Sequence, residues 1–426
     1  MTAEVLILNK IGVAIAADST VTIATSKGDK TYNNANKLFS LSKYHPVGIL
    51  IWNATEFNTI PLEVLIKEFR ESIGKREYAT VTGYSNAFIR YLRTSAPIER
   101  VDQTNAFRAA VQAFCFSLRG EFIEECQVRN IPITQPVITG DSRTLFTDLL
   151  NKFETVVTDF GRNRNFQGIT EARLRTIYPT AANDAARQVF NRVRPTPAQL
   201  RRLVALLYKA ALSNVLSSDM CGIVIAGYGA EEHYPCVVSH ETDGIYANRL
   251  KIVSKRPEPI RRDNQSMIAP FAQRVAANLF VEGVDQTYQD YIDESISDLI
   301  SGLAEVSAKY FKVQNRRRIN SFKKLLSKTA TDYIDVLNAT RWNEFIRPVL
   351  DAVRVLDKAE MATLAESIVS LTALKQKISL DIETVGGPID VAFISKGDGF
   401  IWIKRKHYFD EKLNPFFFKK YLPGTT

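Results

Sequence analysis

The hydrophobic pattern of this chain changes period several times and predicts strands, helices, strands, helices and strands in that order. Near the N-terminus, β-branched runs over 3–9 and 12–22 are separated by Lys10-Ile11-Gly12, which predicts a tight hairpin. Two more strands are expected at 38–41 and 47–52. The second of these runs is apolar throughout, as expected for a strand that is covered on both faces.

After residue 53 the apolar residues recur at helical spacing instead. This pattern predicts helices at 62–73 and 84–93, followed by an almost entirely helical block from 104 to 216. The elements expected after that block are strands at 222–227, 234–239 and 244–252 with a hairpin turn at Thr242-Asp243-Gly244, a second helical block from 268 to 377, and a final hairpin of 389–395 and 400–404.

Two groups of strands separated by pairs of helices predict an α/β protein in which helices pack on two sheets. The long helical blocks are expected to be ordered insertions, because structureless loops of that length are rare. The expected divisions are a discontinuous core of 1–100, 221–285 and 355–406, helical insertions at 101–220 and 286–354, and an aromatic C-terminal tail at 407–426.

Composition fits a large globular protein. Of 426 residues, 45% are hydrophobic and 24% are charged, which excludes disorder and fibrous repeats. The net charge of +9 permits an acidic partner without requiring one. The densest basic run, Arg316-Arg317-Arg318 with Lys323-Lys324, is interpreted as a solvated helix face, so nucleic acid is not the expected partner, although that alternative stays open.

The cysteines and histidines argue against several kinds of site. Neither C-x-x-C nor H-x-x-x-H spacing occurs, so zinc hydrolase chemistry and a metal site are not expected, and a Ser-His-Asp triad is a poor starting point. Four cysteines in a chain of this length suit a reducing cytoplasm. No run approaches the ~20 apolar residues of a membrane helix, so no membrane association is expected. A signal peptide is also disfavoured, because Asn9-Lys10 splits the first apolar run and no basic segment precedes it.

The N-terminus holds the candidate chemistry. Removal of Met1 would leave Thr2 with a free α-amine, and an amine of pKa ~8 can take the proton of the hydroxyl on the same residue. Asp18 follows 16 residues later, on the opposing arm of the predicted hairpin, and Lys37 opens the next predicted strand. Threonine at position 2 also occurs without any catalytic role, so the spacing of the three residues is more informative than any one of them.

The run from Gly12 to Ser19, Gly-Val-Ala-Ile-Ala-Ala-Asp-Ser, resembles the G-V-x-x-A-A-D-S/T run of proteasome β subunits and their bacterial relatives. In that family the aspartate follows the catalytic threonine at the same interval, and Asn36-Lys37-Leu38 resembles the segment that carries the catalytic lysine. Gly386-Gly387 and the final hairpin are similar to the end of the family's domain. The resemblance covers roughly residues 2–95, 221–285 and 355–406 and skips both insertions.

The resemblance implies an N-terminal-nucleophile hydrolase fold, an αββα sandwich of two sheets between helix layers. It also implies a threonine protease or amidase without any cofactor: Thr2 as nucleophile, its α-amine as base, Lys37 tuning that amine, and Asp18 holding Lys37. The substrate would be a peptide or protein. Because the family assembles into rings, a homo-oligomer is expected, and the helical insertions are candidates for binding a partner protein.

Three departures from the family pattern leave alternatives open. The family's oxyanion glycine after the fourth strand is missing, so a backbone N–H of Asn53 or Trp52 would have to serve. The family's auxiliary Asp-x-x-Ser segment is altered, and the substitutes are Asp381, Glu383 or Thr384. The third departure is that no propeptide is expected, so activation would depend on removal of Met1 alone.

Two rival functions remain beside the hydrolase. One is a catalytically inactive scaffold that keeps the same fold for assembly, and the other is a basic module that binds nucleic acid through its helical insertions.

Overall fold

A computed structural model describes residues 3–25, 28–94, 96–131, 140–312, 315–378, 385–407 and 409–414. Helices and antiparallel sheets make up the described chain. It divides into two compact units, a first unit of Met1–Ala35 with Ile260–Thr426 and a second unit of Asn36–Pro259. The predicted site residues Thr2, Asp381, Glu383 and Thr384, together with the aromatic run 416–418 of the tail, lie outside the described residues.

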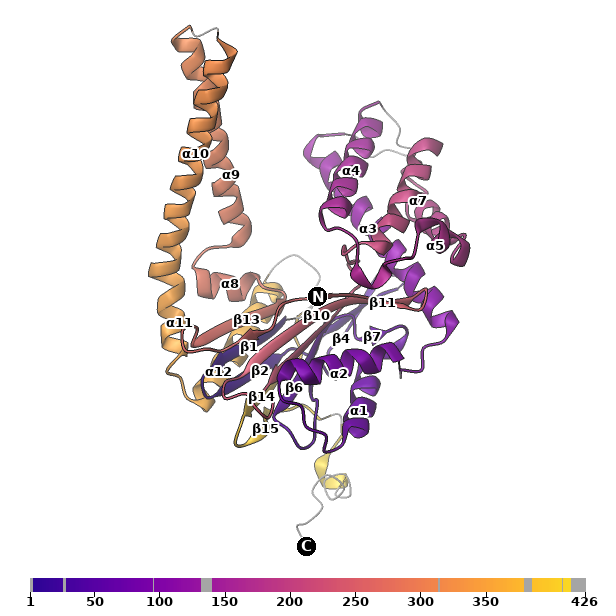
Figure 1. Ribbon diagram of the computed structural model, residues 1–426, viewed down its shortest axis with the longest axis vertical. Helices are drawn as coiled ribbons and strands as arrows, with labels where there is room; N and C mark the ends of the chain where they lie inside the picture. The colour runs from indigo at the N-terminus through magenta and orange to yellow at the C-terminus, as the bar shows by residue number, and fades with distance from the viewer. Residues whose placement is uncertain are drawn as a thin grey trace. The chain divides into compact units, whose positions relative to one another are not determined.

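The first unit combines a five-stranded sheet with long helices (Figure 1). Its elements are β1 (Ala3–Asn9), β2 (Gly12–Ala17), β3 (Val21–Thr25), β4 (Gly28–Tyr32), β13 (Ser266–Ala272), α8 (Val275–Glu282), α9 (Gln286–Tyr310), α10 (Arg316–Arg341), a π-helical turn (Trp342–Ile346), α11 (Arg347–Val353), α12 (Lys358–Lys377), β14 (Asp390–Ser395), β15 (Gly399–Lys404) and a 3-10 turn (Glu411–Leu413).

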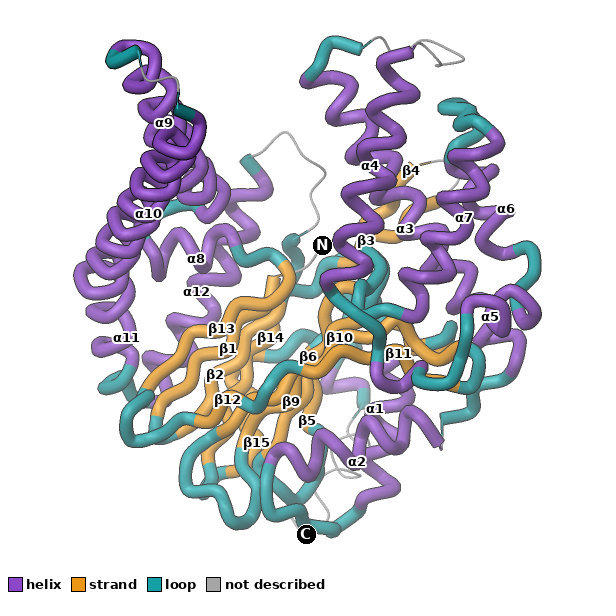
Figure 2. The backbone as a smooth tube through the Cα atoms, turned by 45° about the horizontal axis from the view of Figure 1, so that its top comes forward, coloured by secondary structure: helices purple, strands orange, loops and turns teal. Residues whose placement is uncertain are grey.

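The sheet of the first unit has the order β13-β1-β2-β14-β15, and its strands are antiparallel (Figure 2). One face packs on α12, where alternate residues of β1 such as Val5 and Ile7 contact Ala365 and Ile368. The residues on the opposite face, such as Leu6 and its register neighbours Ile15 of β2 and Ala392 of β14, are also buried. Both faces of the three central strands are therefore covered, which explains why these runs carry so few polar residues.

The second unit joins a six-stranded antiparallel sheet to two groups of helices. Its elements are β5 (Leu38–Ser40), β6 (Val47–Asn53), β7 (Glu56–Phe57), β8 (Ile60–Pro61), α1 (Leu62–Ile73), α2 (Val81–Thr94), α3 (Arg100–Val128), α4 (Gly140–Asp159), a 3-10 turn (Arg164–Phe166), α5 (Glu171–Ile177), α6 (Ala181–Val189), α7 (Pro197–Leu212), β9 (Cys221–Gly227), β10 (Cys236–Tyr246), β11 (Arg249–Ser254) and β12 (Glu258–Pro259).

The sheet of the second unit has the order β11-β10-β9-β6-β5, with β12 paired to β10. Alternate residues of β6, namely Val47, Ile49 and Ile51, pack with the buried stripes of α1 and α2. The long block α3–α7 has a core of its own, which reaches the sheet through Tyr246. The helical character predicted for both insertions is thus confirmed. Among the helices that the structure describes, none has both the length and the apolar character needed to cross a membrane.

One sequence prediction about the N-terminal part of the first unit needs correction. The second predicted strand, 12–22, ends at Ala17. Asp18, Ser19 and Thr20 leave the sheet, and the chain re-enters a separate two-stranded hairpin, β3 and β4. The strand ends there because the Asp18 carboxylate bonds to backbone N–H groups in place of a neighbouring strand.

The start of the second predicted helical block is also wrong. Residues 266–272 form strand β13, which pairs antiparallel with β1 over its whole length. Pro270 lies in this strand, and proline is tolerated there because β13 is at the edge of its sheet. Helix begins only at Val275.

The hairpin turn predicted at Thr242-Asp243-Gly244 lies inside β10 instead, where the register shifts between Thr242 and Gly244. The chain reverses at Ala247 and Asn248, whose φ angles of 51° and 57° are those of a two-residue hairpin turn. The irregularity in β10 is caused by Asn58, which is distant in the sequence but adjacent in space. The Asn58 side chain accepts from the N–H of Ile245 and donates to its carbonyl, both at 2.7 Å, and so takes the place of a strand neighbour.

Candidate functional site

Asp18 holds the beginning of β1 in the first unit. Its N–H donates to the carbonyl of Ala3 at 3.1 Å, and its Oδ1 accepts from the N–H of Ala3 at 3.0 Å. The other carboxylate oxygen accepts from the N–H groups of Thr20 and Gly386, both at 3.1 Å. The side chain is 1% exposed. These bonds fix Asp18 to Ala3, the residue next to Thr2 in the chain.

The corner that follows Asp18 binds two other segments of the first unit. Ser19 donates its N–H to the Gly386 carbonyl at 3.2 Å and its hydroxyl to the Pro388 carbonyl. Thr20 donates its hydroxyl to Asn33 Oδ1 at 3.1 Å. Gly387 has a φ of 70°, and a Cβ there would lie 2.9 Å from the Asn33 carbonyl oxygen, so only glycine fits. The Gly386-Gly387 pair thus serves a tight backbone approach beside Asp18.

Lys37 lies in the second unit, one residue before β5. Its carbonyl accepts from the N–H of Ile51 in β6 at 2.9 Å, which extends the β5–β6 pairing by one residue. Its side chain is 1% exposed, unusual for a lysine. The neighbouring Asn36 donates to both oxygens of Glu63 in α1 at 3.2–3.3 Å. Lys30 is exposed in β4 beside Tyr32.

Asn53 ends β6 with a φ of 65°, in the left-handed region that glycine adopts most easily. Its side chain donates to the carbonyls of Ser218 and Met220 at 2.7 Å, which holds this backbone conformation. Asparagine is among the few other residues that tolerate left-handed φ. This chain lacks the glycine of the family pattern here, and Asn53 in its place has a glycine-like backbone.

Trp52 lies against Gly222 of β9, its partner in the strand register. A Cβ at Gly222 would lie 2.0 Å from the indole atoms, so the ring covers the glycine directly. The indole is 8% exposed, and its Nε1 has no hydrogen-bond partner among the described residues. Buried donors without a partner are uncommon in folded proteins.

Several polar contacts near these positions were not anticipated from the sequence. The hydrogen bonds from Ala3 and Gly386 to Asp18 use backbone N–H donors, and these cannot be predicted from residue type. The φ of Asn53 had a weak signal, because asparagine after an apolar strand is frequent at left-handed positions.

Two buried polar clusters of the second unit lie elsewhere. His240 contacts the hydroxyls of Ser85 and Ser254 at 2.5 and 2.7 Å, and burial, aided by the charge of Arg164, lowers its pKa to about 4. Asp243 and Lys251 form a fully buried ion pair at 2.9 Å, in which burial lowers the lysine pKa. Ser85 is fully buried, so the Ser-His contact supports packing of α2 on β10 and has no access to a substrate.

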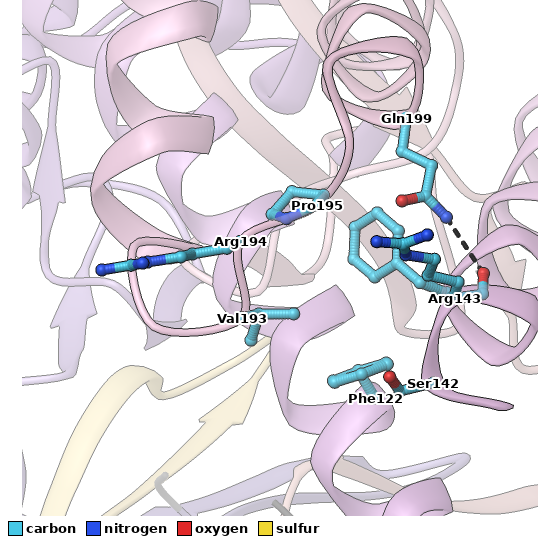
Figure 3. A pocket seen from close by; sticks show the side chains of 8 residues that line it. Phe122, Ser142, Arg143, Val193, Arg194, Pro195 and Gln199 are labelled. Carbon is cyan, nitrogen blue, oxygen red and sulfur yellow. Dashed lines mark hydrogen bonds between the residues drawn. The ribbon is translucent and has the colours of Figure 1, made fainter. Parts of the chain in front are cut away.

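A small pocket in the helical block of the second unit also lacks reactive chemistry (Figure 3). Gln199 bonds to the Arg143 carbonyl at its edge, at 3.0 Å. None of the predicted site residues lines it. The lining residues are Phe122, Ser142, Arg143, Phe146, Val193, Arg194, Pro195 and Gln199.

No group of three His, Cys, Asp or Glu side chains suited to a metal ion occurs within the described ranges. Cys221 and Cys236, like Cys115 and Cys126, are free and buried, as small core residues are. Comparison with protein-family models, with curated proteins and with solved structures finds no match.

Proposed function

We propose that the protein is an N-terminal-nucleophile hydrolase that cleaves amide bonds in a peptide or protein, with Thr2 as nucleophile after removal of Met1. The proposed fold is the αββα sandwich of that class. It is supported by the two antiparallel sheets, each of which has helices packed on one face. Each also has an opposite face of buried apolar residues, such as Leu6 in β1 and Leu50 in β6.

The observation that carries the proposal is the pair of hydrogen bonds between Ala3 and Asp18. Ala3 N is joined to the carbonyl carbon of Thr2, so the α-amine of Thr2 is three covalent bonds from an atom that Asp18 holds. After removal of Met1, Ala3 would be the second residue, and the buried Asp18 carboxylate would fix it. This would restrict the orientation of Thr2, on which nucleophilic attack depends.

The proposed reaction uses the terminal residue twice. The α-amine takes the proton of the Thr2 hydroxyl while the oxygen attacks the substrate carbonyl. The protonated amine then gives that proton to the leaving amine, and water hydrolyses the acyl ester to regenerate Thr2. Lys37 is the proposed cation that keeps the α-amine neutral, and Asp18 is the residue proposed to hold Lys37 in position. Backbone N–H groups at Asn53 or Trp52 are the proposed oxyanion donors.

The test combines mass spectrometry with labelling. Intact mass should show loss of Met1, and a threonine-directed electrophile such as a β-lactone should add one equivalent to Thr2. Thr2→Ala should abolish both labelling and peptide cleavage while the unfolding transition stays unchanged. Thr2→Ser retains a hydroxyl and should keep part of the activity. Active protein that retains Met1 would exclude the mechanism.

A second candidate function, an inactive scaffold with the same fold, is favoured by the contacts of Asp18. Its carboxylate bonds to three backbone N–H groups, which is also what a purely structural aspartate does. The scaffold predicts no labelling of Thr2 even when Met1 is absent. It also predicts that Thr2→Ala changes neither stability nor assembly.

A further inference from the structure

Helices α9 and α10 of the first unit form a long antiparallel hairpin that extends from the sheet (Figure 1). Its internal seam is narrow, with Ala304 and Ala330 as its buried residues. Near the tip, Lys323 of α10 contacts Glu305 of α9 at 2.7 Å. At the base, Arg341 of α10 contacts Glu282 of α8 at 3.4 Å.

Each helix of the hairpin also carries an apolar stripe that faces solvent. The stripe residues are spaced by three, four or eight positions, so they share one side of their helix. The exposed fractions of these residues lie between 39% and 79%. Single exposed apolar residues are normal, but contiguous ones mark a surface for interaction. The stripes consist of Tyr288, Tyr291, Leu299, Leu303, Val306 and Tyr310 on α9, and Phe322, Leu325, Tyr333 and Val336 on α10.

The two stripes form one surface. At about 100° per residue, each exposed stripe lies roughly 100–150° before the buried alanine of its own helix, in the direction of increasing residue number. Because the helices are antiparallel, offsets in this direction turn both stripes to the same side of the hairpin. We call this surface the outer face. A helix with two apolar sides at this angle is typical of a bundle of four helices, of which the hairpin supplies two.

The charge distribution along the hairpin selects a second copy of this chain as the occupant. The tip half, 299–328, contains eight basic residues and one acid, whereas the base half, 285–298 with 330–341, contains seven acids and one base. Two hairpins that pair tip to base bring each basic half against an acidic half. Tip-to-tip pairing would instead bring like charges together.

The size of the outer face also fits a stable dimer. A helix of 25 residues is about 37 Å long, and two helices side by side are roughly 20 Å wide. The face therefore covers roughly 700 Å², close to the ~800 Å² per partner of a standard interface.

We propose that this hairpin pairs tip to base with the hairpin of a second copy, so that the two outer faces form the core of an antiparallel four-helix bundle. A two-fold axis that exchanges tip and base passes across the middle of the hairpin. It therefore places α9 against α9 and α10 against α10, with the two copies of Leu299 near the axis. The inference is independent of catalysis at Thr2.

The first experiment measures the oligomeric state of the full chain by analytical ultracentrifugation. The wild type should be a dimer, and Leu299→Asp should raise the dimer dissociation constant at least about tenfold, because it buries a charge in the bundle core. Val355→Asp is the matched control, since Val355 is equally exposed in the same unit but lies off the hairpin, and it should leave the dimer intact. Equal helical circular dichroism in both variants excludes unfolding as the cause.

Charge reversal at the edges of the outer face tests the orientation. Glu294→Lys with Asp298→Lys reverses the base, and Arg318→Glu with Lys328→Glu reverses the tip. Each variant alone should dimerise more weakly than the wild type, and a mixture should form a heterodimer tighter than either homodimer. If the base variant alone dimerises more tightly, the hairpins pair tip to tip and the proposed arrangement is wrong.

Cross-linking gives a third readout against a low background, because the four native cysteines are buried. Leu299→Cys should form a disulfide between copies on oxidation, whereas Tyr310→Cys should not. A wild-type chain that stays monomeric up to about 100 μM would overturn the proposal. So would a monomer that binds a DNA duplex through the tip with steep salt dependence, which would assign the basic tip to nucleic acid.

Discussion

At the scale of single residues, Asp18 connects the start of β1 to the segment before β14. Replacing it by alanine would leave three backbone N–H groups, those of Ala3, Thr20 and Gly386, without their acceptor. A buried unsatisfied donor costs about 1–3 kcal/mol, and entry of water offsets part of this, so we expect Asp18→Ala to lower the free energy of unfolding by about 2–4 kcal/mol. Urea denaturation measures the change.

Asp148→Ala is the control for this prediction, because Asp148 is an exposed aspartate on α4. It should change the free energy of unfolding by less than about 0.5 kcal/mol. An Asp18→Ala variant as stable as the control would mean that the three N–H groups find other partners.

A second residue-scale prediction concerns the contact of Trp52 with Gly222. Gly222→Ala places a methyl group within the volume of the indole, so the ring or the strand must shift. We expect a loss of about 1–3 kcal/mol in the free energy of unfolding and a change in tryptophan fluorescence. Trp52→Leu frees the space, so the same Gly222→Ala change should cost less in that background. Equal losses in both backgrounds would exclude the steric cause.

At this scale the sequence anticipates part of the local geometry. It places Asp18 on the arm of the hairpin opposite the N-terminus, and the structure has Asp18 bonded to Ala3 of β1. The left-handed backbone of Asn53 was missed, because it depends on carbonyls from the segment before β9, far along the chain. Contacts to distant backbone atoms leave no pattern in the local sequence.

At the scale of elements, the contact between α2 and β10 contains a histidine that should make stability depend on pH. His240 is 5% exposed, and burial first and the charge of Arg164 second lower its pKa from 6.5 to about 4. Between these values the unfolded chain binds a proton that the folded chain does not, so stability falls as the pH falls. The slope of about 1.4 kcal/mol per pH unit gives a loss of about 3 kcal/mol between pH 6.5 and pH 4.

The variant His240→Gln cannot titrate and should lack this part of the pH dependence. Free energies of unfolding at pH 7, 6 and 5 measure it as the difference between wild type and variant, since the other groups cancel. That difference should favour the wild type most at pH 7 and shrink toward pH 5. A constant difference would mean that folding leaves the pKa of His240 unchanged.

Strands and helices with a clear period were predicted well, while positions decided by pairing were not. The periodic stripes of α1 and α2 gave both helices, and the apolar run of β6 gave its strand. The sequence predicts helix where β13 lies, because this short apolar run has no decisive period and its pairing with β1 decides its conformation. The sequence predicts a turn at the irregularity in β10, because Asp-Gly favours turns wherever it occurs and the distant residue Asn58 that bonds there leaves no local signal.

At the scale of the whole molecule, the pattern predicted sheets interrupted by two helical insertions, and both insertions are helical. What each insertion does could not be predicted in the same way. The apolar residues of α9 and α10 are visible in the sequence, but periodicity alone does not tell which stripe faces the other helix. Only the pairing of the hairpin separates its seam from its outer face, and this separation shows that a hydrophobic surface remains uncovered.

If the outer face is a dimer interface, the stability of the chain depends on its concentration. A partner that binds the folded hairpin and not the unfolded one stabilises it by mass action, so a tenfold higher protein concentration shifts the unfolding equilibrium by up to about 1.4 kcal/mol. We expect the thermal midpoint of the helical circular dichroism signal to rise with concentration in the wild type and in Val355→Asp. In Leu299→Asp it should stay constant. The opposite result, a midpoint that rises equally in all three proteins, would place the association on another surface and leave the outer face to a different partner.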